Sequence, residues 1–262
     1  MANNLQGKSM GKEKQVINGM LQELIKRMKE LNYEGFKIKR LKRMVNELQQ
    51  NDVHSIDKVV QKLMNGVNNK EAYKDIDKEG RFAIILARNR FSGVTFIKED
   101  IKHKTPDLKA MWNRNTIYFE VTRKRSIEDE WADPLEDPKL PSNKTGNIIG
   151  KIKAESKQLK PGEINIVVYW SSTLAVLEPE MKEAIKEIDS DPEQYKDLTG
   201  VLFTEDGAVS IPKLQQFYLF KNDKASKLLG TRLTKKLSSL HEQDIKQFQK
   251  GHQSILAMLM QP

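Results

Sequence analysis

The segment from Thr105 to Arg125 constrains the fold most, because its residues predict a β-hairpin. Leu108–Trp112 has the length and composition of a short strand, and Asn113–Asn115 supplies a polar turn. The second strand runs from Thr116 to Thr122 and is rich in β-branched and aromatic residues. Glu120 lies in the middle of that strand, where a carboxylate is costly unless it has a partner.

Asp107, at the start of the first strand, is the candidate neighbour of Glu120. Because side chains alternate between the two faces of a strand, Glu120 shares one face with Thr122 and Lys124, while the opposite face is apolar. Two carboxylates brought together repel each other, and a divalent cation is a common remedy. The hairpin therefore predicts a metal site built on Asp107 and Glu120.

The spacing of these residues resembles that of the PD-(D/E)xK, or restriction-endonuclease-like, nuclease superfamily. Pro106-Asp107 and Glu120 match the two acidic positions that hold Mg²⁺ in that superfamily. Thr122 stands where the superfamily has a lysine that orients the attacking water. The resemblance implies a restriction-endonuclease-like core that hydrolyses DNA phosphodiester bonds with Mg²⁺ or Mn²⁺, as an endo- or exodeoxyribonuclease if the site is active.

A third acid, Glu79, lies on a helix predicted from Lys70 to Arg88. It falls inside the apolar stripe of that helix, which is an unusual place for a carboxylate. One interpretation is a boundary residue that reaches water or pairs with a lysine. The other follows from the resemblance, because many members of the superfamily carry a metal-binding Glu on the helix before the catalytic hairpin.

Two lysines are candidates for the charge that Thr122 lacks. Lys124 lies on the same strand face as Glu120, one pleat further on. Lys151 lies on a helix predicted from Asn147 to Leu159, on the same flank as Gln158. Lys151 and Gln158 could be two solvated polar residues, but the resemblance implies that residues of this helix reach the active site, which makes both of them candidates. We favour Lys151, because groups held on helices are positioned more reliably than groups at the end of a strand.

The order of predicted elements indicates an α/β fold, since strands alternate with helices after residue 70. With the resemblance, we expect a mixed central sheet flanked by helices, preceded by an N-terminal helical module. The predicted division is residues 1–68 for the helical module and 69–262 for the α/β nuclease-like domain, which ends in a C-terminal helix.

Several smaller features complete the predicted topology. The first helix begins at Glu13 after a frayed start, with an apolar seam that ends at Leu31, and Ser55 caps the third helix. Ser126–Thr145 is expected to be a loop or disordered. The remaining elements are strands at Phe91–Ile97, Glu163–Ser171 and Gly200–Thr204, a helix at Glu178–Ile188, a hairpin at Ala208–Phe220, and a helix from Lys235 onward.

The chain carries a formal charge of +9 and has a sequence pI of about 9.4, which favours a polyanionic partner such as DNA. A basic helix face with Lys37, Arg40 and Arg43 is either a phosphate-contacting surface or an ordinary solvated face. There is no cysteine, which excludes disulfides and thiolate metal sites. The absence of a signal-like or membrane-length apolar run predicts a cytoplasmic protein with no membrane partner.

Three functional hypotheses follow from these patterns. The first is a metal-dependent DNA nuclease. The second is a catalytically inactive nuclease-fold protein that binds nucleic acid or assembles a complex, since Thr122 replaces the expected lysine. The third is an unrelated α/β protein whose acids are structural. Apolar seams on the N-terminal and C-terminal helices make a homodimer through either of them possible.

Overall fold

The computed structural model describes residues 3–98, 105–123, 144–171, 177–205 and 217–241. Four helices come first in the chain, and they are followed by strands interrupted by further helices. The helices are α1 (Asn3–Glu30), α2 (Gly35–Gln50), α3 (Ile56–Gly66), α4 (Lys70–Arg88), α6 (Lys144–Glu155), the 3₁₀ turn η1 (Ser156–Gln158), α7 (Leu177–Ser190) and α8 (Thr231–Ser238).

The strands form one six-stranded sheet whose spatial order follows the sequence. Strands β1, β2 and β3 pair antiparallel, β3, β4 and β5 pair parallel, and β6 returns antiparallel to β5. This arrangement confirms an α/β fold with a mixed sheet. The strands are β1 (Ser92–Phe96), β2 (Leu108–Trp112), β3 (Asn115–Arg123), β4 (Ile164–Ser171), β5 (Gly200–Glu205) and β6 (Phe217–Lys221).

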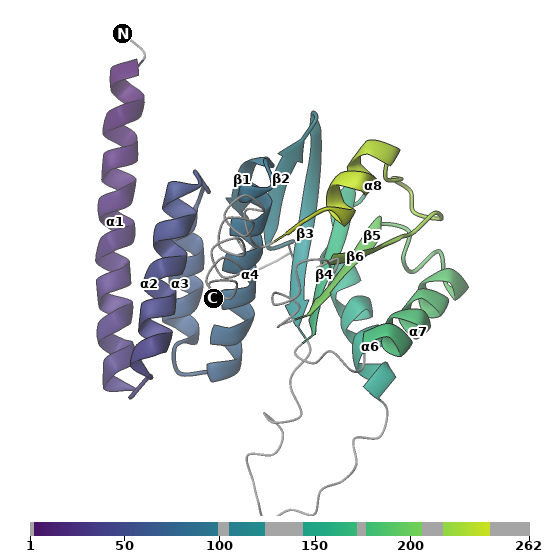
Figure 1. Cartoon of the computed structure of the whole chain (residues 1–262), viewed down its shortest axis with the longest axis horizontal. Coiled ribbons are helices and arrows are strands. Elements are labelled where there is room, and N and C mark those ends of the chain that lie inside the picture. Colours follow the sequence, from purple (N-terminus) through teal and green to yellow (C-terminus); the bar gives the residue numbers. More distant parts are fainter. Residues whose placement is uncertain (1–2, 99–104, 124–143, 172–176, 206–216, 242–262) are drawn as a thin grey trace, which may run out of the picture.

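Helices cover both faces of the sheet (Figure 1). Strand β4 shows this best, because it is buried on both sides and its side chains alternate between two apolar clusters. Trp170 packs in the cluster that contains Phe82 of α4. Tyr169 packs in the second cluster, with Ile148 of α6 and Ala184 of α7. The sheet is therefore the middle layer between α4 and the α6–α7 pair.

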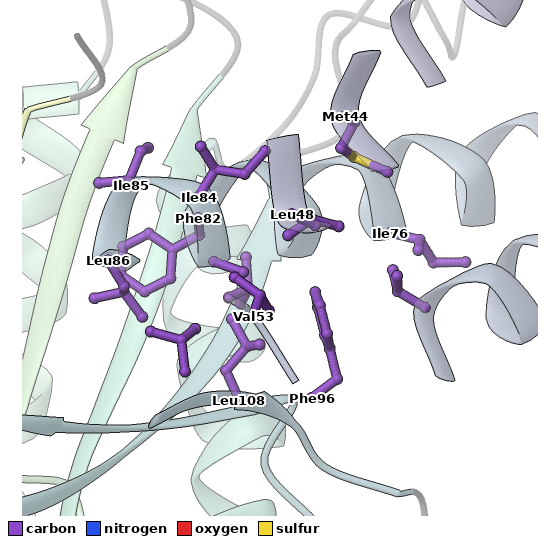
Figure 2. Close-up of a cluster of buried hydrophobic side chains, with 14 of the residues drawn as sticks. Met44, Leu48, Val53, Ile76, Phe82, Ile84, Ile85, Leu86, Phe96 and Leu108 are labelled. Atoms are coloured by element: carbon purple, nitrogen blue, oxygen red, sulfur yellow. The ribbon is translucent and has the colours of Figure 1, made fainter. Parts of the chain in front are cut away.

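The N-terminal helices pack on the side of α4 that faces away from the sheet (Figure 1). Figure 2 shows Met44 and Leu48 of α2 in the same cluster as Ile76 of α4 and Phe96 of β1. The cluster extends from α1 to the sheet without interruption, so apolar burial links the two parts of the chain. A division at residue 68 stays a prediction.

Three predicted details of the N-terminal region are wrong. Helix α1 begins at Asn3 and not at Glu13, because the Leu, Gln, Lys and Met residues of this stretch are good helix formers without any apolar periodicity. Leu31 is 44% exposed, since the helix ends one residue before it and the seam ends with Met28. Ser55 makes no capping hydrogen bond, because its backbone is left-handed (φ 58°, ψ 38°) and not in the extended region typical of an N-cap.

Two later helices also differ from the prediction. The α-helix expected to reach Leu159 ends at Glu155 and tightens into η1, where the Ser156 hydroxyl donates to the Ile152 carbonyl at 2.6 Å. Helix α8 begins at Thr231 and ends at Ser238, so the expected continuous helix from Lys235 stops early. Most of the predicted loop, the start of the predicted hairpin at Ala208, and the C-terminal seam beyond residue 241 lie outside the described residues.

Among the described residues, no helix is long and apolar enough to span a bilayer.

Candidate active site

The β2–β3 register brings the two predicted acids together at the centre of the sheet. Leu108 pairs with Phe119, so one further step places Asp107 opposite Glu120. The backbone N–H of Val121 donates to Asp107 Oδ2 at 2.9 Å. This bond fixes the Asp107 carboxylate against β3, the third of the six strands. The predicted adjacency of the two acids is therefore present in the structure.

Glu120 is buried, with 5% of its surface exposed, and its two oxygens differ sharply. Oε1 accepts a hydrogen bond from Gln158 Nε2 at 3.1 Å. Oε2 is buried and has no hydrogen-bond partner among the described residues. Burial raises the pKa of the Glu120 carboxyl well above its usual value, and the negative charges of Asp107, Glu155 and Glu79 raise it further. Glu120 therefore lies in a strongly acidic, poorly compensated environment.

Gln158 and Glu155 approach Glu120 from the end of α6. The Gln158 amide donates to Glu120 and also to the Glu155 carboxylate. Gln158 reaches these groups from η1, so the 3₁₀ turn and not a continued α-helix sets its position. Glu155 was not predicted as a site residue, although its position three residues before Gln158 places both on one side of a helical turn.

Lys62 links the N-terminal helices to the acidic site. Its Nζ lies 3.1 Å from Glu79 Oε2 and 3.0 Å from Asp107 Oδ1, and its side chain is 19% exposed. Its charge lowers the pKa of the Glu120 carboxyl, against the stronger effect of burial and the neighbouring acids. Glu79 is itself buried on α4, as its place in the apolar stripe predicted. The lysine that contacts the acids thus comes from α3.

Lys151, the lysine predicted to supply the missing charge, does not contact the acids among the described residues. Thr122 is buried on the strand position two residues after Glu120. Lys151 is half-buried on α6, and no contact joins it to the acidic residues in the part of the chain that the structure describes. Lys124 lies outside the described residues. Lys62, and not Lys151, is therefore the lysine that contacts the acids among the described residues.

The donor set suits a hard divalent cation at Asp107 and Glu120. Carboxylate oxygens are the ligands that Mg²⁺ and Mn²⁺ prefer, and Mg²⁺ often binds through one or two carboxylates while it keeps several waters. The buried, unpartnered Glu120 Oε2 is the donor that most needs such a partner. Within the described residues, no three acidic or histidine side chains form a metal-sized group. Lys62 lies between Glu79 and Asp107, so Glu79 is the least suited of the predicted ligands.

The basic residues predicted to contact DNA each have an acidic partner. Lys37 pairs with Glu34 and Arg43 with Glu47, both at 2.9 Å. Such exposed pairs contribute little and leave the cation available to a phosphate. Arg40 differs, because its guanidinium donates through two nitrogens to the buried carboxylate of Asp77, at 3.1 and 2.5 Å. Arg40 therefore stabilises the α2–α4 contact.

No family model matches the sequence, and no significantly similar chain was found among curated proteins or solved structures.

Proposed function

We propose that the protein is a metal-dependent nuclease that hydrolyses DNA phosphodiester bonds, with Asp107 and Glu120 holding Mg²⁺ or Mn²⁺. The observation that carries the proposal is the buried, unpartnered Oε2 of Glu120 beside a second carboxylate. A buried carboxylate oxygen without a partner is costly to the fold. A bound cation would give this oxygen the partner that the described residues do not supply, which makes the site a strong candidate for cation binding.

The surrounding residues position these ligands. Val121 N–H fixes one oxygen of Asp107, and the Gln158 amide fixes one oxygen of Glu120. Each acid therefore presents its remaining lone pairs in a set direction. The chemistry that a bound ion supplies is the activation of a water and the offset of negative charge at the scissile phosphate.

A catalytically inactive nuclease-fold protein that binds nucleic acid or assembles a complex is the second candidate. Two observations favour it: Thr122 provides no positive charge, and Lys62 already contacts two of the acids. The net charge of +9 suits nucleic-acid binding under either proposal.

Cleavage of single- and double-stranded DNA in Mg²⁺, in Mn²⁺ and in EDTA tests the proposal. We expect products only with a divalent ion, and none from Glu120→Gln. Glu183→Gln, on the exposed side of α7, is the matched control and should cleave normally. If wild-type protein binds DNA but cleaves neither form, the inactive alternative is favoured. Activity gained only on Thr122→Lys would identify a nuclease site weakened by the loss of its lysine.

A further inference from the structure

The hydrogen bonds of Asp107 leave little room for a metal ion to bind without a rearrangement. Oδ2 accepts from the Val121 N–H at 2.9 Å, and Oδ1 accepts from Lys62 Nζ at 3.0 Å. The first of these partners belongs to the β3 backbone and cannot move away independently of the strand. The second is the end of a flexible side chain. A cation that approaches Asp107 therefore meets Lys62 as its competitor.

Helix α3 holds Lys62 in this place. Val59, Val60 and Leu63, which flank Lys62 along the helix, are completely buried. The backbone at Lys62 is therefore anchored in the core, so any withdrawal from Asp107 has to be a movement of the side chain. Glu79 Oε2 also lies 3.1 Å from the ammonium, and it offers a second carboxylate that retains the lysine.

We propose that Lys62 is a built-in competitor of the divalent cation, so that metal must displace its ammonium from Asp107 before the site is loaded. This inference rests on the proposed metal site and concerns how strongly that site binds. A positive charge within hydrogen-bond distance of a metal ligand repels the incoming ion and occupies one of the ligand's lone pairs. Lys62 therefore weakens metal binding and makes loading dependent on the withdrawal of its side chain from Asp107.

Titration of the full chain with Mn²⁺, followed by calorimetry, tests this role. Lys62→Met keeps much of the apolar stem and removes the charge, and we expect it to bind Mn²⁺ about tenfold more tightly or better. Lys62→Arg keeps the charge and should bind like the wild type, within about threefold. Lys58→Met, on the same helix but paired with Asp57, is the matched control and should leave the affinity unchanged.

Thermal unfolding provides a second measurement on the same variants. Lys62→Met leaves the acids without this ammonium, so the melting temperature of the variant in EDTA should be lower than that of the wild type. Adding Mn²⁺ should raise the melting temperature of Lys62→Met by more than it raises that of the wild type. If Lys62→Met does not fold in EDTA, Lys62→Met/Glu79→Gln removes one carboxylate together with the cation. That double variant should also bind Mn²⁺ more tightly than the wild type.

The outcomes separate this inference from the proposed function. Equal or weaker Mn²⁺ binding by the charge-removing variants, with clear binding by the wild type, overturns the role of Lys62 alone. No binding by any of the proteins overturns both the metal site and this inference. Binding by Lys62→Met but not by the wild type supports the inference and shows that the natural protein is not a metal-loaded nuclease.

Discussion

Two buried polar residues on one face of the sheet, Asn165 and Glu120, differ in how well their hydrogen bonds are satisfied. Asn165 lies on β4 opposite Tyr118, two residues before Glu120 along β3. Its Nδ2 is within hydrogen-bond distance of three backbone carbonyls, and its Oδ1 accepts the backbone N–H of Lys160 at 3.1 Å. Glu120 has one satisfied oxygen and one without a partner.

The difference shows which polar group serves the fold and which is available for binding. A buried amide with all its partners inside the protein joins segments of the chain and needs nothing from outside. A buried carboxylate with a free oxygen and three acidic neighbours destabilises the protein that contains it. The hydrogen bonds of Asn165 are thus structural, and the unsatisfied Glu120 marks the candidate site.

The largest expected effect is on catalysis, and Asp107→Asn produces it. The amide oxygen can still accept the Val121 N–H, so the hairpin should keep its register, but the negative charge for a metal is lost. Loss of several kcal/mol of charge stabilisation corresponds to about a thousandfold slower cleavage. Single-turnover cleavage at saturating Mg²⁺ measures the rate, and circular dichroism confirms the fold. A rate within tenfold of the wild type would argue that Asp107 is not a ligand.

The next effect is on stability, and Asn165→Ala tests the structural half of the comparison. The substitution leaves the Lys160 N–H and several carbonyls without their buried partner. We expect the free energy of unfolding to fall by about 3 kcal/mol, since each buried polar group left without a hydrogen-bond partner costs about 1–3 kcal/mol. Urea denaturation measures the loss. A change below about 1 kcal/mol would show that Asn165 is not the stabilising contact described here.

Glu120→Gln should change the free energy of unfolding in the opposite direction from Asn165→Ala, and by less. In EDTA at pH 7 we expect it to stabilise the fold by about 1 kcal/mol, because an uncharged amide is less costly to bury. The folded protein keeps the Glu120 proton where the unfolded chain, with a carboxyl pKa near 4.5, has lost it. Wild-type stability should therefore fall as the pH rises from about 4.5 through the raised pKa, and the advantage of Glu120→Gln should grow over the same interval. Urea denaturation at several pH values checks this, and a constant difference would contradict it.

The smallest effect concerns DNA binding by the α2 surface. Lys37→Gln/Arg43→Gln should weaken DNA binding a few-fold and reduce the slope of log K against log salt by about 1–2, because each phosphate contact releases about one counterion. Fluorescence anisotropy at several salt concentrations measures the slope. Lys186→Gln/Lys196→Gln removes the same charge from exposed positions elsewhere and serves as the control. If both double variants reduce the salt dependence of DNA binding equally, the α2 surface is an ordinary solvated face.

Local patterns predicted the elements that depend on short-range periodicity. The bounds of β2 and α4, and the burial of Glu79, follow from alternation and from a helical stripe. The helical pattern also placed Gln158 on this segment, but not the 3₁₀ turn from which its amide reaches Glu120. Lys62 could not be found this way, because its contact with Asp107 spans 45 residues and depends on how α3 packs against α4.

The hydrogen bond between Asp107 and Val121 links the candidate site to the folding of the hairpin. A side-chain oxygen, and not a main-chain carbonyl, receives the Val121 N–H at this end of the β2–β3 ladder. A slip of β2 by one residue would turn its side chains to the opposite face and carry Asp107 away from that N–H. Chains that pair in the wrong register would thus lose apolar burial and the acidic pair in the same step. Folding to the correct β2–β3 register therefore also brings Asp107 opposite Glu120, so one pairing event sets both the hairpin and the acidic pair.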